Sequence, residues 1–153
     1  MQPLKYAVSI ILYNDKKQFL VVKRPEEERD LGGIWGFPAV SFDPSMESFD
    51  GAVARVGREK LNCEVEPVGR LPITIIQERD GYDLLLIDYK CRVVKGEPDV
   101  RKARTSATKY ADQKWTSDPG ILMEGAEKGS CCIQLFLHDI GLWPREKFRT
   151  SLK

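Results

Sequence analysis

Two pairs of strand-like stretches, separated by one amphipathic stretch, limit the ways in which this chain can fold. Residues 5–13 and 18–24 are rich in β-branched and aromatic side chains, and the polar residues between them predict a hairpin. Residues 64–78 and 83–95 have the same character and are joined by a turn at Asp80-Gly81. Strands that precede and follow a central helix predict an α/β domain with a mixed sheet.

The amphipathic stretch predicts a helix over residues 45–61. Asp43 is expected to accept backbone N–H groups as the N-cap residue, and Pro44 suits the first helical position. Asn62 follows the stretch, where a residue in the left-handed conformation commonly ends a helix. The apolar residues recur at three- and four-residue steps, which predicts one buried face. That face consists of Met46, Phe49, Ala52, Val53 and Val56.

The last third of the chain predicts a loop, a short strand and a second helical region. Residues 96–112 are expected to form the loop, and Trp115 is expected on the final strand. A helical pattern covers residues 121–137. Glycine weakens a helix, so an interruption is expected at Gly125 or Gly129.

The composition favours a water-soluble protein. The chain has 153 residues, and we expect residues 1–153 to form one domain. Charged residues make up 31%, and the apolar runs are far shorter than the roughly 20 residues that cross a membrane. The N-terminus has no secretory-signal pattern, and a net charge of +1 gives no reason for a nucleic-acid partner. We therefore expect a cytoplasmic protein with no membrane or nucleic-acid partner, either monomeric or oligomeric.

The cysteines and the single histidine do not predict a zinc site. No pair of cysteines has CxxC spacing, and adjacent Cys131 and Cys132 cannot easily form a disulfide. We expect these two residues, Cys63 and Cys91 to be reduced, buried thiols. His138 is expected to be a core or surface imidazole, because the sequence offers no second histidine and no paired thiols as zinc ligands.

The stretch from Trp35 to Cys63, WGFPAVSFDPSMESFDGAVARVGREKLNC, resembles the signature region of the Nudix (MutT-type) family. The family box reads G-x5-E-x7-R-E-U-x-E-E-x-G-U, where U is an aliphatic residue. Glu47 falls on the first box glutamate, and Arg55 follows at the spacing of the box arginine. Glu59 falls on the first residue of the Glu-Glu pair. The order of elements fits the family over nearly the whole chain.

Five positions depart from the box, and one of them is Gly57, which stands at an aliphatic position. Val56 stands where a glutamate follows the arginine, and Lys60 replaces the second glutamate of the pair. Ser41 and Asn62 replace two glycines. Hard divalent cations need several oxygen ligands, and a reversed charge opposes a dication, so the resemblance implies much reduced metal affinity. Alternatively, the Lys60 ammonium takes the place of a metal and touches a phosphate oxygen directly.

The resemblance implies a Nudix fold, with a mixed β-sheet sandwiched between α-helices, and cleavage of a nucleoside diphosphate-linked compound with Mg²⁺ or Mn²⁺. Glu47 and Glu59 are then the candidate metal ligands, although Glu47 also suits a helix start. Arg55 and Glu59 are candidate catalytic residues, with Arg55 pairing or orienting Glu59. The family often has another glutamate before the final strand. Lys109 stands there, so Asp112 is the nearest candidate base, with a solvated loop aspartate as the alternative.

Further residues are candidates for ligand binding or for the missing carboxylates. Trp35, Phe37 and Tyr82 are suited to stack on a base or another flat group, and packing in the core is the alternative role of such rings. Lys60 is the candidate for a phosphate contact. The carboxylates available outside the family spacing, besides Asp112, are Asp43, Asp50 and Glu64.

Three hypotheses for the function follow. The first is a metal-dependent hydrolase of a nucleoside diphosphate-linked substrate, with an incomplete box. The second is a catalytically inactive Nudix-fold module that binds a nucleotide or regulates a partner, with no metal required. The segment KRPEEERDLGGIWGFP supports it, because this segment resembles the Nudix-related C-terminal domain of adenine-specific DNA glycosylases, which recognises without hydrolysis. The third is a structural or oligomerising domain that binds no ligand.

Overall fold

The computed structural model describes residues 2–105 and 107–148. Among these residues, eight strands form one mixed sheet with the order β3-β2-β1-β7-β5, in which β4 pairs with β1, β6 with β7 and β8 with β2. The mixed sheet that the sequence predicts is confirmed. The strands are β1 Leu4–Tyr13, β2 Phe19–Lys23, β3 Trp35–Gly36, β4 Ala39–Phe42, β5 Glu64–Arg70, β6 Ile75–Arg79, β7 Tyr82–Lys95 and β8 Asp112–Thr116.

The central strand β1 changes partners along its length. It runs parallel to β7 over all ten residues, while its first half pairs antiparallel with β4. The predicted hairpin with β2 is present, but β1 and β2 meet only at Tyr13↔Phe19. Strand β2 then diverges and pairs with β8, on which Trp115 lies as expected. The sheet therefore opens between β4 and β2.

The predicted strand over residues 64–78 is two strands, which corrects the sequence-based expectation. Strand β5 ends at Arg70, and Leu71 turns inward, with only 4% of its surface exposed. Pro72 follows and cannot donate a hydrogen bond to a sheet ladder, so pairing resumes only at β6. The predicted turn before β7 is confirmed, because Gly81 adopts a φ of 86°.

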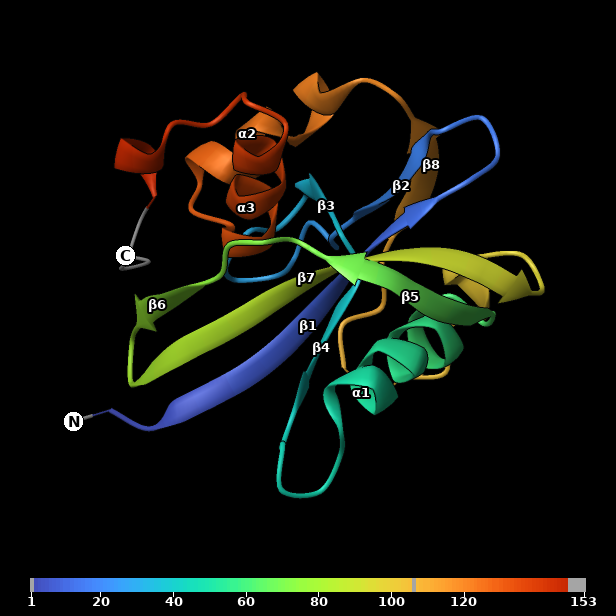
Figure 1. Cartoon of the computed structure of the whole chain (residues 1–153), viewed down its shortest axis with the longest axis horizontal. Helices are drawn as coiled ribbons and strands as arrows, with labels where there is room; N and C mark the ends of the chain where they lie inside the picture. Colours follow the sequence, from blue (N-terminus) through green and yellow to red (C-terminus); the bar gives the residue numbers. More distant parts are fainter. Residues whose placement is uncertain (1, 106, 149–153) are drawn as a thin grey trace.

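Helices cover both faces of the sheet (Figure 1). One face carries α1 (Phe49–Arg55) and a π-helical turn, η1 (Val56–Lys60); the other carries α2 (Met123–Glu127) and α3 (Cys131–Asp139). Alternate residues of β1 face the two layers, because successive side chains of a strand point to opposite sides. Val8, Ile10 and Leu12 pack with α1, whereas Ala7 and Ile11 pack with α2 and α3.

The first helix is shorter than the predicted helix over residues 45–61. Its N-cap is Ser48, whose Oγ accepts the Gly51 N–H at 2.9 Å, whereas Asp43 accepts the Ser45 N–H in a preceding turn. Met46 lies in that turn and is 85% exposed, so its assignment to the buried face is wrong. Ala52, Val53 and Val56 are fully buried, as predicted. Asn62 adopts the expected left-handed conformation, with a φ of 52°.

The C-terminal helical region is interrupted at Gly129, one of the two expected positions, where φ is 97°. The other candidate, Gly125, instead lies inside α2, where an added Cβ would lie 2.4 Å from Cδ1 of Ile133. All four cysteines are free and buried, as predicted. Three single 3₁₀ turns complete the described elements: η2 Val100–Lys102, η3 Pro119–Leu122 and η4 Arg145–Lys147. Across the described ranges, none of the helices has the length and apolar character that spanning a membrane requires.

Candidate functional site

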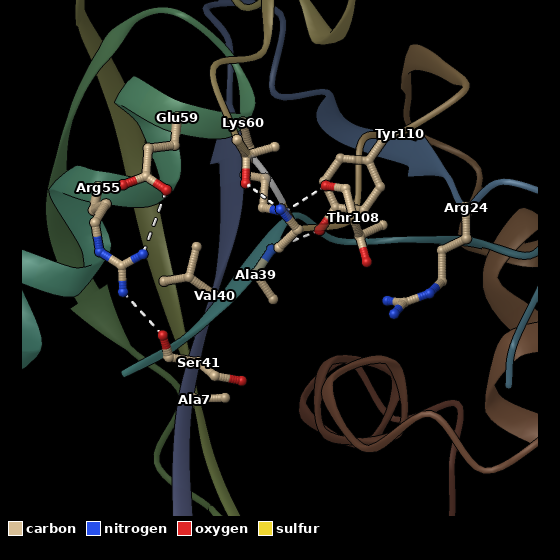
Figure 2. Close-up of a pocket in the computed structure, with 12 residues that line it drawn as sticks. Ala7, Arg24, Ala39, Val40, Ser41, Arg55, Glu59, Lys60, Thr108 and Tyr110 are labelled. Atoms are coloured by element: carbon tan, nitrogen blue, oxygen red, sulfur yellow. Dashed lines mark hydrogen bonds and ion pairs between the residues drawn. The ribbon is translucent and has the colours of Figure 1, made fainter. Parts of the chain in front are cut away.

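A pocket of about 340 Å³ lies beside the free edge of β4, between η1 and the segment that precedes β8 (Figure 2). Its volume falls within the range of small-molecule sites. Three of its side chains are cationic and one is a carboxylate. The described residues that line it are Ala7, Arg24, Ala39, Val40, Ser41, Arg55, Glu59, Lys60, Thr105, Ala107, Thr108 and Tyr110.

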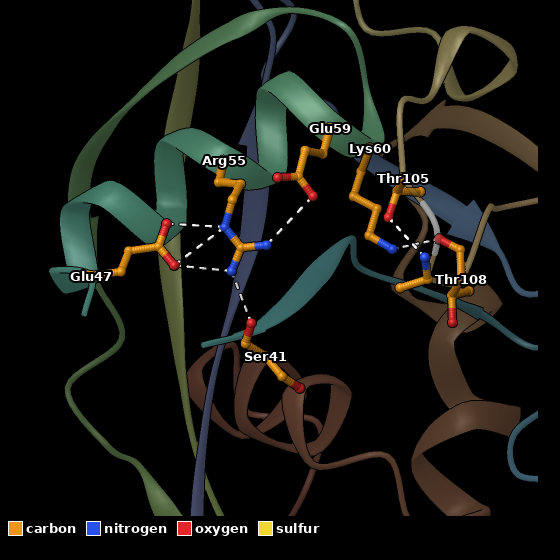
Figure 3. Close-up of polar contacts among 8 residues, drawn as sticks. Ser41, Glu47, Arg55, Glu59, Lys60, Thr105 and Thr108 are labelled. Carbon is orange, nitrogen blue, oxygen red and sulfur yellow. Dashed lines mark hydrogen bonds and ion pairs between the residues drawn. The ribbon is translucent and has the colours of Figure 1, made fainter. Parts of the chain in front are cut away.

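Arg55 binds both glutamates of the incomplete box at one end of the pocket (Figure 3). Its Nε lies 3.0 Å from Oε2 of Glu47, and its Nη2 lies 3.0 Å from Oε1 of the same carboxylate. Its Nη1 contacts Glu59 at 3.4 Å, and Nη2 also donates to the Ser41 carbonyl oxygen at 2.9 Å. Hydrogen bonds to Glu47 are the main reason why the pKa of Arg55 is raised. The guanidinium is therefore fully engaged.

The residues at this end do not fit a divalent metal. Glu47 and Glu59 already accept hydrogen bonds from a cation, and Val56 belongs to the core. No group of three or more histidine, cysteine, aspartate or glutamate side chains in the described ranges is arranged to hold a metal ion. The other candidate carboxylates do not fill the gap, since they are exposed and lie outside the pocket lining: Asp43, Asp50 and Glu64.

Lys60 extends from η1 into the middle of the pocket and is only 2% exposed. Its Nζ donates to the carbonyl oxygen of Thr108 and lies 5.4 Å from the centroid of the Tyr110 ring. Burial lowers the pKa of this ammonium, and the positive charge of Arg24 lowers it further. Lys60 thus places a desolvated positive charge in the position that the box assigns to a glutamate.

The π-helical turn that positions Lys60 depends on Gly57. A Cβ at this residue would lie 2.9 Å from Cγ2 of Val65 and 3.0 Å from the Cys63 carbonyl oxygen. Only a glycine lets the turn approach β5 this closely. π-Helical turns are frequent at functional sites. The close approach to β5 therefore explains why Gly57 stands where the family box has an aliphatic residue.

The wall opposite Arg55 contains residues that sequence reasoning missed. Tyr110 is buried and its hydroxyl accepts the Ala39 N–H at 2.9 Å, which ties the segment before β8 to the edge of β4. Burial raises the pKa of Tyr110 to about 12, so the phenol stays neutral. Arg24 follows β2, is held by Glu28 through a 2.8 Å ion pair, and points toward the pocket (Figure 2).

Five predicted site residues do not line this pocket: Trp35, Phe37, Glu47, Tyr82 and Asp112. Phe37 is 2% exposed, and its ring packs against Phe19 and Phe136, so it is a core residue with no free face for a ligand. Trp35 lies on β3, half-buried against the same core layer. Asp112 is exposed at the start of β8, where its carboxylate accepts its neighbour's N–H, and it does not reach the pocket. The structure therefore brings together Arg55, Glu47, Glu59 and Lys60 only.

Comparisons with known proteins identify the fold. No family model and no curated protein matches the sequence. Among solved structures, a NUDIX hydrolase from Nitrosomonas europaea is similar with a TM-score of 0.68 and 19% identity, covering 97% of both chains. The MutT protein of Methanosarcina mazei Go1 has a TM-score of 0.64 and 20% identity, covering 91% of this chain and 94% of that one.

A third similar structure contains a ligand. The NUDIX domain of Shewanella oneidensis NrtR, complexed with ADP ribose, has a TM-score of 0.55 and 18% identity and covers 92% of this chain and 85% of that one. The three likenesses extend over nearly all of this chain. The chain has the Nudix fold.

Proposed function

We propose that this protein binds a small nucleotide or another diphosphate compound in the pocket beside β4, and that it hydrolyses this ligand feebly or not at all. The observation that carries the proposal is the buried ammonium of Lys60, which lines the pocket at a box position. The two remaining box glutamates are bound to Arg55 instead of facing a metal. The pocket is built to attract an anion.

A buried charge is costly unless it is paired. In the described parts of the chain, no carboxylate lies within ion-pair distance of the Lys60 Nζ, whose contacts are a carbonyl oxygen and an aromatic ring. An ammonium has three hydrogen-bond donors, and a phosphate oxygen is a strong acceptor for them. An anionic ligand therefore supplies the partner that the protein does not.

The identity of the ligand class rests on the fold. The similar NUDIX domain of Shewanella oneidensis NrtR is complexed with ADP ribose, which contains a diphosphate. A compound of this kind is the first ligand to test here. The four free, buried thiols suit a reducing compartment, so we place this function in the cytoplasm.

A metal-dependent hydrolase is the second candidate. The observation in its favour is that Glu47 and Glu59 converge on one guanidinium, and Glu59 lines the pocket. If Arg55 moved away, Mg²⁺ or Mn²⁺ would find two acidic ligands there. Hard cations take at least six oxygen ligands, so water and substrate would have to supply most of them.

Phosphate release tests both candidates. Wild type, Glu59→Gln and Lys60→Glu are compared on nucleoside triphosphates, ADP-ribose and dinucleoside polyphosphates with Mg²⁺ or Mn²⁺. We expect no release above background from wild type and a gain of release in Lys60→Glu, because this variant restores a box carboxylate within the pocket. Release by wild type that disappears in Glu59→Gln would contradict the proposal and support the hydrolase.

A further inference from the structure

We propose that Lys60 and Arg24 bind the diphosphate directly and replace the divalent metal, so that ligand binding is independent of metal ions. This inference rests on the proposed function, because it names how the same pocket holds its ligand. The two cations would allow the protein to bind its ligand although the described residues form no metal site.

The charge of the pocket supports direct binding. The described lining has three cationic side chains, Arg24, Arg55 and Lys60, and one carboxylate, Glu59. Arg24 pairs with Glu28 and Arg55 with Glu47, two carboxylates outside the lining, so Lys60 is the cation of this lining that has no ion-pair partner among the described residues. Arg55 is engaged by five hydrogen bonds within the protein. Lys60 and Arg24 are the cations left for a ligand.

Lys60 and Arg24 come from separate elements and reach the pocket from different sides (Figure 2). Their charges interact, since the guanidinium of Arg24 contributes to the lowered pKa of Lys60. Two like charges brought together in a half-buried site repel each other, and an anion between them removes that cost. A diphosphate has two phosphoryl groups and therefore suits two cations better than a single phosphate does.

Both cations are held in place before any ligand arrives. The Thr108 carbonyl oxygen fixes the Lys60 ammonium, and the Arg104 N–H donates to the Glu59 carbonyl oxygen at 2.7 Å, which holds the segment before β8 against η1. Glu28 binds the Nε of Arg24 at 2.8 Å and leaves the other guanidinium nitrogens for a ligand. Such preorganisation reduces the entropic cost of binding.

Isothermal titration calorimetry tests this inference with three probes that share the diphosphate: ADP-ribose, ADP and inorganic pyrophosphate. Each is titrated into the whole chain in EDTA and in Mg²⁺. For at least one probe, we expect dissociation constants that agree within about twofold between the two buffers, because fixed cations do not depend on free metal. Binding that appears only with Mg²⁺ would overturn the inference and leave the proposed function intact.

Two variants identify the cations. Lys60→Met and Arg24→Gln should each weaken binding in EDTA by about tenfold or more, since each removes a charge-assisted hydrogen bond. The matched controls, Lys114→Met and Arg29→Gln, change exposed residues outside the pocket and should leave affinity unchanged. Thermal unfolding confirms that each variant is folded, and the half-exposed Arg24 provides the second variant if Lys60→Met does not fold.

The outcomes separate the two proposals. Binding in EDTA that neither variant weakens would refute the role of the two cations while preserving a binding function. If wild type binds none of the three probes in either buffer, the proposed function fails together with this inference.

Discussion

The two ends of the pocket use charge in opposite ways. At the Arg55 end, one guanidinium forms ion pairs with two carboxylates, so these charges already have partners within the protein. At the Lys60 end, a nearly completely buried cation faces a carbonyl oxygen and an aromatic ring, with Arg24 nearby. The contrast teaches that a pair which matches the family box, Arg55 with Glu59, can be satisfied within the protein. Lys60, which departs from the box, has no ion-pair partner among the described residues.

Gly57→Ala should disturb the Lys60 end most. The added Cβ would lie 2.9 Å from Cγ2 of Val65, and such overpacking costs about 1–3 kcal/mol of stability. Because the π-helical turn carries Lys60, affinity for ADP-ribose in EDTA should also fall. Urea unfolding and calorimetry measure the two effects. Gly69→Ala is the control, since nothing lies within 4 Å of its Cβ position, and a large loss there would contradict this account.

Arg55→Gln separates the two ends. It removes the partner of Glu47 and Glu59 in a half-exposed network, so we expect a loss of about 1–2 kcal/mol in urea unfolding. Mg²⁺ should recover part of this loss by binding the two freed carboxylates. Arg58→Gln, on the same turn but exposed, is the control.

The same variant should change ADP-ribose affinity in EDTA by less than about threefold, because Lys60 and Arg24 remain. A loss of affinity as large as that of Lys60→Met would show that the Arg55 end also binds the ligand, and the contrast between the two ends would then fail.

Asp88→Asn tests a second buried ionisable group, which is hidden in the core instead of facing a pocket. Asp88 is 1% exposed and hydrogen-bonded to Ser9, and burial raises its pKa well above the ordinary value of 3.8. The folded state therefore keeps this proton to higher pH than the unfolded state. The protonated Asp88 carboxyl therefore stabilises the folded state below about pH 4. This contribution is lost as the pH rises through the raised pKa that Asp88 has in the folded state.

The asparagine variant does not titrate, so its stability relative to wild type should increase with pH between about pH 4 and pH 8. Urea unfolding across this range measures the difference. A difference that stays constant with pH would show that Asp88 has the same pKa in both states. Lys60 is the opposite case, since burial lowers its pKa.

Much of the fold was predictable because it depends on local patterns. The β-branched and aromatic residues over 5–13 predict β1, which is buried on both faces along most of its length, and Gly81 and Gly129 stand between elements where a positive φ is required. The start of the first helix was not predictable from Asp43, because Ser48 competes as an N-cap and prevails. The break between β5 and β6 depends on Pro72 and on the inward turn of Leu71, which periodicity does not show.

The candidate site was predictable only along the box helix. Arg55 and Glu59 are four residues apart, so their contact follows from helical geometry. The contact of Lys60 with Thr108 spans 48 residues, and that of Ala39 with Tyr110 spans 71. No local pattern in the sequence indicates such contacts. The place of Asp112 likewise depends on a contact between distant residues, because β8 pairs with β2 and Asp112 lies opposite Lys23.

A crystal structure with ADP-ribose and Mn²⁺ tests the central claim most directly, because anomalous scattering locates the ion. The account predicts a phosphate oxygen within hydrogen-bond distance of the Lys60 Nζ, the Arg24 guanidinium against the same diphosphate, and Arg55 still bound to Glu47 and Glu59. An ion bridging Glu47, Glu59 and the diphosphate, with Arg55 displaced, would contradict it.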